Sequence, residues 1–213
     1  MRTHPIRVSP LPASMIAELL STIPLSGAVR ERHFDVSAGH NAWVRFDDGE
    51  GDEWVGVFGA TKLSGFDAVA PFGDDGGLTI LVIAGGQGYV VGARSGELLR
   101  RTPWFRSQAV IAPPECDFVL VADETGAWAT GRQADRPVWR RDRAAHDSSP
   151  RSPAQRLALD GIVFQDVSPQ QATGRVREVD GWYAFTIDLR TLEFSLGPFL
   201  SREWPVQHAA PAV

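Results

Sequence analysis

The stretch Leu78–Arg101 constrains the fold more than any other part of the chain. Residues 79–84, TILVIA, are an unbroken run of β-branched and aliphatic side chains with a glycine pair on each side. This length and these flanks favour a strand covered on both faces over a helix. The glycines of 85–88 can supply the positive φ angles of a tight turn, and residues 89–93 then alternate with the two-residue period of a pleated strand. Residues 97–102 can return as a third strand, so the stretch predicts a β-meander.

Comparable patterns recur along the chain. The apolar strands that lead three of them begin at Thr79, Phe118 and Ile162, which are 39 and 44 residues apart. A period near 40 with three or four strands is typical of propeller blades or stacked meanders. The sequence therefore predicts a mainly all-β fold of repeated antiparallel β-meanders, either propeller-like or a stacked sandwich or barrel. The expected units are about 30–59, 78–102, 117–142 and 160–196.

One short helix is expected before the first unit, over residues 14–23. Ser14 is a suitable N-cap, and Pro24 and Gly27 end the segment. The apolar residues lie at helical spacing and form one stripe that can pack on the sheet: Met15, Ile16, Leu19, Leu20 and Ile23.

The segment 143–156, RAAHDSSPRSPAQR, has no apolar periodicity and two prolines, which predicts a mobile loop. The strand pattern resumes in kind after it. We therefore expect a single β domain over residues 1–213.

Charge argues against a nucleic-acid-binding protein. The formal net charge of the 213 residues is −5. Seven arginines lie between Arg132 and Arg156 near Trp128 and Trp139, and basic residues beside rings can hold single strands. Because the chain as a whole is acidic, we expect this region to form a solvated sheet edge followed by a loop.

The cysteine count and the N-terminus favour the cytoplasm. Cys116 is the single cysteine, so neither an intramolecular disulfide nor a thiolate metal cluster is expected. Pro10, Pro12 and Glu18 interrupt any signal-like apolar run, and no stretch has the apolar length that crosses a bilayer. We expect a cytoplasmic protein without a cofactor, a bound metal or a membrane partner.

The most localised charge feature is an acidic loop between two predicted strands. It holds five carboxylates in seven positions: Asp47, Asp48, Glu50, Asp52 and Glu53. The ordered ligand spacing of a calcium loop is absent, so a solvated hairpin tip is expected rather than a metal site. Because crowded carboxylates repel one another, a protein partner with a basic surface would relieve that repulsion. The acidic loop is the candidate binding site.

Two other features allow different functions. His33 and Asp35 are two residues apart on a predicted strand and can form a general-base pair, although no nucleophile-elbow motif accompanies them. Trp104 and Trp204 lie beside prolines outside the main strands, where exposed rings can bind sugars or other small ligands.

The segment 88–91, GYVV, followed by 94–99, RSGELL, resembles the strand–turn–strand core of quinoprotein-type propeller repeats. Gly92 stands at that family's acidic position, Ser95 replaces its threonine, and no tryptophan follows Leu99. Residues 160–197 resemble the closing part of short uncharacterised bacterial β proteins. Both resemblances imply a β architecture and transfer no active-site residue.

The leading functional hypothesis is a non-enzymatic, cytoplasmic bacterial protein-binding protein of the immunity or accessory type. One alternative is a hydrolase that uses His33 and Asp35 in a pocket between meanders. Another is a small-ligand or sugar-binding module with exposed tryptophan. A pocket around His33 and Asp35 would favour the enzyme, whereas an open surface without one would favour the binder.

Overall fold

The computed structural model contains sixteen strands and no helix among the residues that it describes. The described residues are 16–24, 29–36, 41–47, 51–59, 66–73, 78–102, 107, 109–123, 126–140, 161–178 and 180–202. The strands form four sheets of four strands each, named A to D here in chain order. The prediction of a mainly all-β fold is therefore confirmed. The described strands form no closed barrel.

Sheet A is the only one of the four whose strand order departs from the chain order. Its strands are β1 (Ile16–Leu19), β2 (Arg30–Phe34), β3 (Asn41–Asp47) and β4 (Glu53–Gly59). They lie in the order β1-β3-β4-β2. β3 and β4 form an antiparallel hairpin, and β2 joins the far edge of β4 in parallel.

Sheets B, C and D are antiparallel meanders whose spatial order follows the chain. Sheet B holds β5 (Ala68–Phe72), β6 (Thr79–Ala84), β7 (Gln87–Gly92) and β8 (Leu98–Arg101). Sheet C holds β9 (Ala109–Ile111), β10 (Phe118–Asp123), β11 (Gly126–Gly131) and β12 (Asp135–Arg140). Sheet D holds β13 (Ile162–Val167), β14 (Gln171–Arg177), β15 (Trp182–Asp188) and β16 (Phe194–Ser201).

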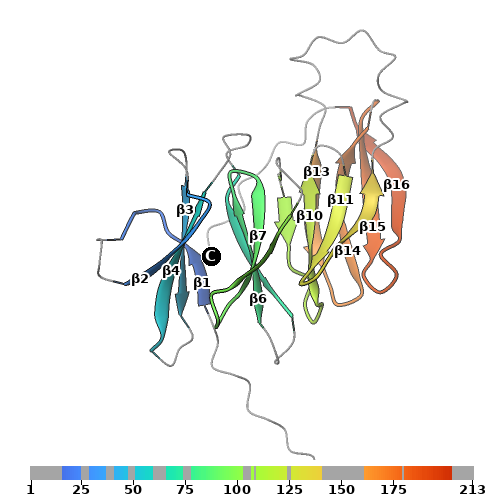
Figure 1. Ribbon diagram of the computed structural model, residues 1–213. Coiled ribbons are helices and arrows are strands. Elements are labelled where there is room, and N and C mark those ends of the chain that lie inside the picture. Colours follow the sequence, from blue (N-terminus) through green and yellow to red (C-terminus); the bar gives the residue numbers. More distant parts are fainter. Residues whose placement is uncertain are drawn as a thin grey trace, which may run out of the picture.

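The four sheets stack face to face in a row, from sheet A to sheet D (Figure 1). Three apolar layers separate them. Aromatic side chains such as Phe46 and Phe58 fill the layer between A and B. Smaller aliphatic side chains such as Leu81 and Val119 fill the layer between B and C. Phe185 and its neighbours fill the layer between C and D. Every residue of β6 and β10 is buried because both strands are covered on both faces.

Adjacent sheets are also joined along both of their edges. The first strands of consecutive sheets contact one another: β1 with β5, β5 with β9, and β9 with β13. At the opposite edge, Asp35 after β2 pairs with Arg101 of β8, and Arg100 of β8 pairs with Asp135 of β12. The ring of Trp139 in β12 stacks on Phe194 in β16, with ring centroids 5.3 Å apart. We call β2, β8, β12 and β16, which lie at this edge, the outer strands. Each outer strand contacts the next one along the row, and β16 is the last.

The turn predicted at residues 85–88 is confirmed. Ala84 pairs with Gln87, and the two residues between them, Gly85 and Gly86, have φ angles of 53° and 89°. Two consecutive positive φ angles are the requirement of a type I′ hairpin turn, which glycine meets without a steric penalty. Asp67 stabilises the turn, because its Oδ1 accepts a hydrogen bond of 2.7 Å from the Gly85 N–H.

The helix expected over residues 14–23 is wrong. Residues 16–19 form β1, and the Leu20 N–H extends the pairing with a 2.8 Å hydrogen bond to the carbonyl of Trp43. A segment this short gains little from helix propensity alone, so pairing with the edge of β3 decides its conformation. The apolar stripe does not cover the core, since Ile16, Leu19 and Ile23 are 50%, 39% and 69% exposed.

The predicted units differ from the sheets in their boundaries. Sheet B starts at Ala68, sheet C at Ala109, and sheet D extends to Ser201, because each sheet has a strand that the predicted units omit or shorten. Most of these strands are short or lie at sheet edges, where the apolar pattern is weak. The segment 143–156 lies outside the described residues, so its mobility stays a prediction, as does the single domain over 1–213.

Candidate functional sites

The acidic loop lies at the tip of the β3–β4 hairpin. Asp47 ends β3 and pairs with Glu53, the first residue of β4. Asp52 lies between them, next to Gly51, whose φ angle is 101°. Asp48 and Glu50 lie outside the described residues. The hairpin is as predicted, while the use of its carboxylates for binding stays a prediction.

His33 and Asp35 have different partners in the structure. His33 Nε2 lies 3.2 Å from Glu31 Oε2, and the carboxylate of Asp35 forms an ion pair with Arg101. Asp35 follows the end of β2 in a left-handed conformation with φ of 51°, so it no longer shares the strand face of His33. The side chain of His33 is 53% exposed. The expected general-base pair of these two residues is therefore not assembled.

Cys116 is a free, half-buried thiol. Burial raises its pKa, and the nearby negative charges of Asp117 and Glu115 raise it further. A thiol with a raised pKa stays protonated at neutral pH, and the thiolate is the nucleophilic form. This environment suits a packing role.

The aromatic rings near the arginine-rich region pack against the protein's own side chains. The guanidinium of Arg140 lies 5.6 Å from the centre of the Trp128 ring, and Trp139 stacks on Phe194. Because these rings already contact side chains of the protein, they are poorly placed to stack on the bases of a nucleic acid. Trp104 and Trp204, the candidate ligand-binding rings, lie outside the described residues.

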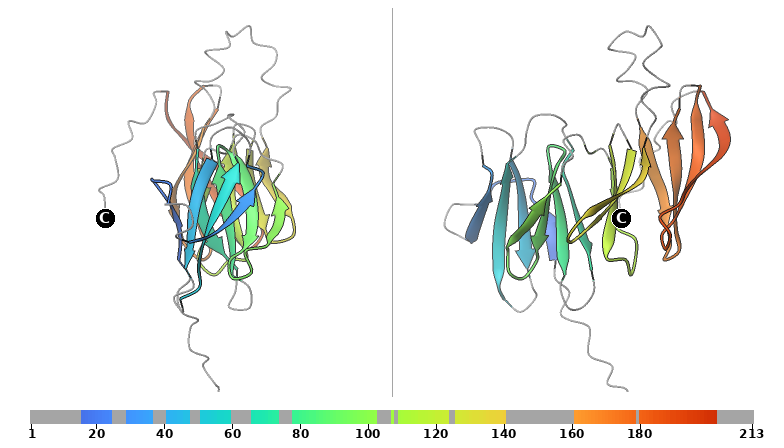
Figure 2. Two further views of the ribbon diagram at one scale, coloured as in Figure 1. Left: turned by 60° about the vertical axis from the view of Figure 1, so that its left-hand side comes forward. Right: turned by 45° about the vertical axis from the view of Figure 1, so that its right-hand side comes forward.

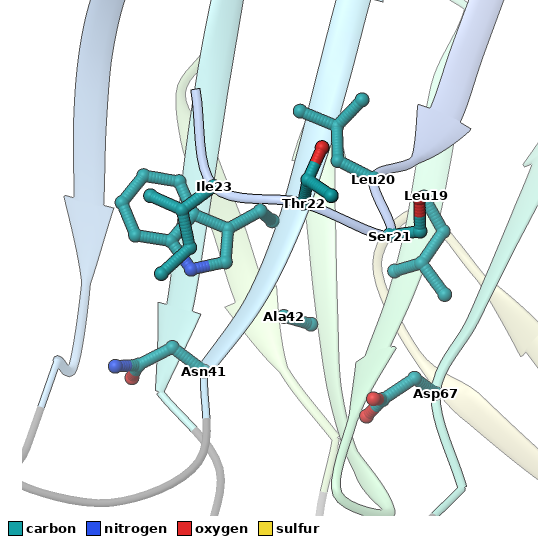
Figure 3. Close-up of a pocket in the computed structure, with 9 residues that line it drawn as sticks. Leu19, Leu20, Ser21, Thr22, Ile23, Asn41, Ala42 and Asp67 are labelled. Atoms are coloured by element: carbon teal, nitrogen blue, oxygen red, sulfur yellow. The ribbon is translucent and has the colours of Figure 1, made fainter. Parts of the chain in front are cut away.

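A pocket of about 380 Å³ lies where sheets A and B meet (Figure 3). Its lining is mixed: Leu19, Leu20, Ser21, Thr22, Ile23, Asn41, Ala42, Trp43 and Asp67. Figure 3 shows residues 19–23 crossing over Ala42, with Asn41 and Asp67 on either side and the Asn41 amide pointing away from Asp67. Asn41 Oδ1 is buried without a hydrogen-bond partner. The polar groups do not converge on one point, as they do in a typical specific ligand site.

Strand β16 is the most unusual surface element of the described residues. It is the longest strand, with eight residues, and it forms an edge of sheet D. Three of its large apolar side chains are exposed: Leu196 by 51%, Phe199 by 46% and Leu200 by 43%. In the right-hand view of Figure 2, β16 (red) lies at the outer end of the row with no strand beyond it.

The outer edge strands of the other three sheets are charged. β2 reads RERHF, β8 reads LLRR and β12 reads DRPVWR, whereas β16 reads FSLGPFLS. Charges on an edge strand oppose pairing with another chain, because such pairing would place them in a desolvated sheet. β16 has no charge, and its protecting features are Pro198 and the two register shifts in its pairing with β15. The expected unit 160–196 ends inside this strand and does not show that the edge is exposed; the uncharged run 194–201 is the signal that could have revealed it.

The chain was compared with protein-family models, curated proteins and solved structures, and none of them matches it. Within the described ranges, no helix is long and apolar enough to cross a membrane. The same residues contain no group of three or more His, Cys, Asp or Glu side chains placed to hold a metal ion. Among the described residues, the uncharged edge of β16 and the pocket near Trp43 are two surface features that could contact a partner or ligand.

Proposed function

We propose that this protein is a non-enzymatic protein-binding protein of the immunity or accessory type, acting in the bacterial cytoplasm. The observation that carries the proposal is the β16 edge, where Leu196, Phe199 and Leu200 are exposed on a strand without charge. Exposed apolar groups on an open edge strand are the features that β-strand addition uses: main-chain hydrogen bonds supply affinity, and side-chain contacts supply specificity. The partner on this surface is a polypeptide segment in an extended conformation.

The first prediction concerns capture of that partner. Phe199→Glu is expected to abolish the capture of a specific protein by the tagged chain from extracts of its source cell, because the charge would enter the paired sheet. Mass spectrometry of the captured proteins gives the measurement. Ile16→Glu is the matched control, since Ile16 is 50% exposed on β1. Identical captured proteins with wild type and Phe199→Glu would contradict the proposal.

We also propose that the acidic loop steers a partner with a basic surface. Replacing Asp48, Glu50 and Asp52 with lysine is expected to leave folding intact and to weaken capture at low salt at least severalfold. The difference should shrink at high salt, because ions screen exposed charges within about 10 Å at 0.1 M ionic strength. Capture that is unchanged at low salt would remove the acidic loop from the binding surface.

A small-ligand-binding module is the second candidate, supported by the pocket beside Trp43. Asn41 lines this pocket, and its side-chain amide would hydrogen-bond to a polar ligand group there. Thermal-shift measurements with a panel of sugars and amines would detect such a ligand. Its binding should be lost in Asn41→Leu and retained in Phe199→Glu.

A further inference from the structure

The partner of the β16 edge can be argued further, and this step rests on the proposed function. Every other outer strand is fastened to the next sheet by an ion pair or a ring contact. β16 has no next sheet within the described chain, and its uncharged sequence lacks the charges found on β2, β8 and β12. A partner strand complements this edge when it places apolar side chains opposite Leu196 and Phe199, because a charge opposite them would lose hydration without a counterion.

We infer that the partner is β16 of a second copy of this chain, paired antiparallel about a two-fold axis between Gly197 and Pro198. In this register Leu196 lies opposite Phe199 of the second copy, and Phe199 lies opposite Leu196 of the second copy. Each pair is apolar, so the two strands complement each other. The same operation on β8 would place Arg100 opposite Leu99 and Arg101 opposite Leu98 of the second copy. On β2, where four of the five residues are ionisable, it would place Arg32 opposite its own copy.

Leu196 and Phe199 lie on the same face of sheet D, as the proposed pairing requires. Leu196 pairs with Phe185 and Phe199 pairs with Tyr183, and both of these β15 residues pack in the layer between sheets C and D. Residues three apart would normally face opposite sides of a strand. The register shift between Tyr183 and Phe185 brings them to one side. The dimer would therefore form a four-residue apolar cluster on one face of the joined sheets.

The centre of the proposed contact suits close approach of two backbones. Gly197 has no side chain, and Pro198 has no N–H group to leave unpaired at the axis. Pairing through eight residues buries an area at the low end of specific interfaces, about 1,200 Å² or less in total. We therefore expect a dimer that dissociates on dilution.

Sedimentation of the full chain from low to high micromolar concentration tests the inference. The mass is expected to rise from that of the 23.2 kDa monomer to twice that value. Phe199→Glu is expected to stay monomeric throughout, whereas Ile16→Glu, with an equally exposed site on β1, should dimerise like wild type. A monomeric mass for wild type at every concentration would overturn the inference, and so would a dimer that Phe199→Glu leaves intact.

Disulfide cross-linking tests the register. In a Cys116→Ser background, a Leu196→Cys copy is mixed with a Phe199→Cys copy of different size. Directly opposed residues have Cβ atoms about 4.5–5.5 Å apart, close enough to cross-link with a small adjustment. The mixed pair should therefore cross-link, and neither variant alone should do so. Absence of the mixed product would overturn this register. A wild-type monomer that still captures another protein through β16 would overturn the second copy as occupant and leave the proposed function standing.

Discussion

Phe58→Ala is expected to lower the free energy of unfolding by about 3–5 kcal/mol, the usual cost of removing a fully buried phenylalanine ring. Phe58 is 0% exposed and lies in the centre of the aromatic layer between sheets A and B. Its ring stacks on Phe34 with centroids 4.7 Å apart and contacts Tyr89 at 5.4 Å. Alanine would leave a cavity between the two sheets, and this cavity cannot close unless both sheets move. Urea unfolding followed by circular dichroism measures the change.

Phe199→Ala is the matched control, because it removes the same side chain from the surface. Phe199 is 46% exposed and makes one edge-to-face ring contact, with Tyr183. The expected loss is less than about 1 kcal/mol when the protein is dilute enough to be monomeric. Equal losses for Phe58→Ala and Phe199→Ala would mean that the aromatic layer between sheets A and B is not a tightly packed core.

Tyr89 in the same layer adds a dependence on pH. Its hydroxyl donates a 2.6 Å hydrogen bond to the carbonyl of Gly59, and burial raises the pKa of the phenol. The charge of Asp35 raises it further, while Arg101 acts in the opposite direction. Because the folded state favours the neutral phenol, this contribution to stability is complete below the ordinary pKa of tyrosine. It is lost as pH rises through the higher pKa of the folded state.

The sequence was most informative where strands are buried on both faces. Residues 80–84 and 118–122 are uninterrupted apolar runs, and both lie in central strands of their sheets. Gly85 and Gly86 located the hairpin between β6 and β7 because few other residues accept positive φ angles. Apolar runs and turn glycines depend on local chemistry, so one sequence was enough to read them.

The repeat length was only half informative. Thr79 and Phe118 begin equivalent second strands of sheets B and C, so their spacing of 39 residues is a true repeat. Ile162 begins the first strand of sheet D, and the strand equivalent to β10 is β14, which begins at Gln171. The regular spacing to Ile162 therefore compared strands in different positions. Edge strands such as β9, with three residues, carry too little pattern to correct the assignment.

The candidate sites depended on contacts that no local pattern contains. Asp35 pairs with Arg101, 66 positions away, and this ion pair separates it from His33. The apolar residues of β1 have helical spacing, but pairing with the free edge of β3 makes this segment a strand. The exposure of β16 follows from its place at the end of the row, which is a property of the whole stack. A sequence pattern can show that a strand is apolar, but not that nothing covers it.

Asp135→Ala is expected to lower the free energy of unfolding by about 3 kcal/mol, near the lower end of the cost of breaking a buried ion pair. Asp135 receives two hydrogen bonds from Arg100, of 2.8 and 2.6 Å, and Arg100 also donates a 2.7 Å bond to the carbonyl of Gly131. The two side chains are only 16% and 14% exposed, so alanine would leave the guanidinium charge desolvated between sheets B and C.

The Asp35–Arg101 pair provides the comparison, because it joins sheets A and B in the same way but is exposed. Its side chains are 55% exposed for Arg101 and 38% for Asp35. Solvent and salt screen such a pair, so Asp35→Ala should cost at most about 1 kcal/mol. The double variant Arg100→Met with Asp135→Leu should be more stable than Asp135→Ala, since it removes both buried charges together. If Asp135→Ala costs no more than Asp35→Ala, the junction between sheets B and C depends on its apolar layer alone, and the ion pair serves only to align the two outer strands.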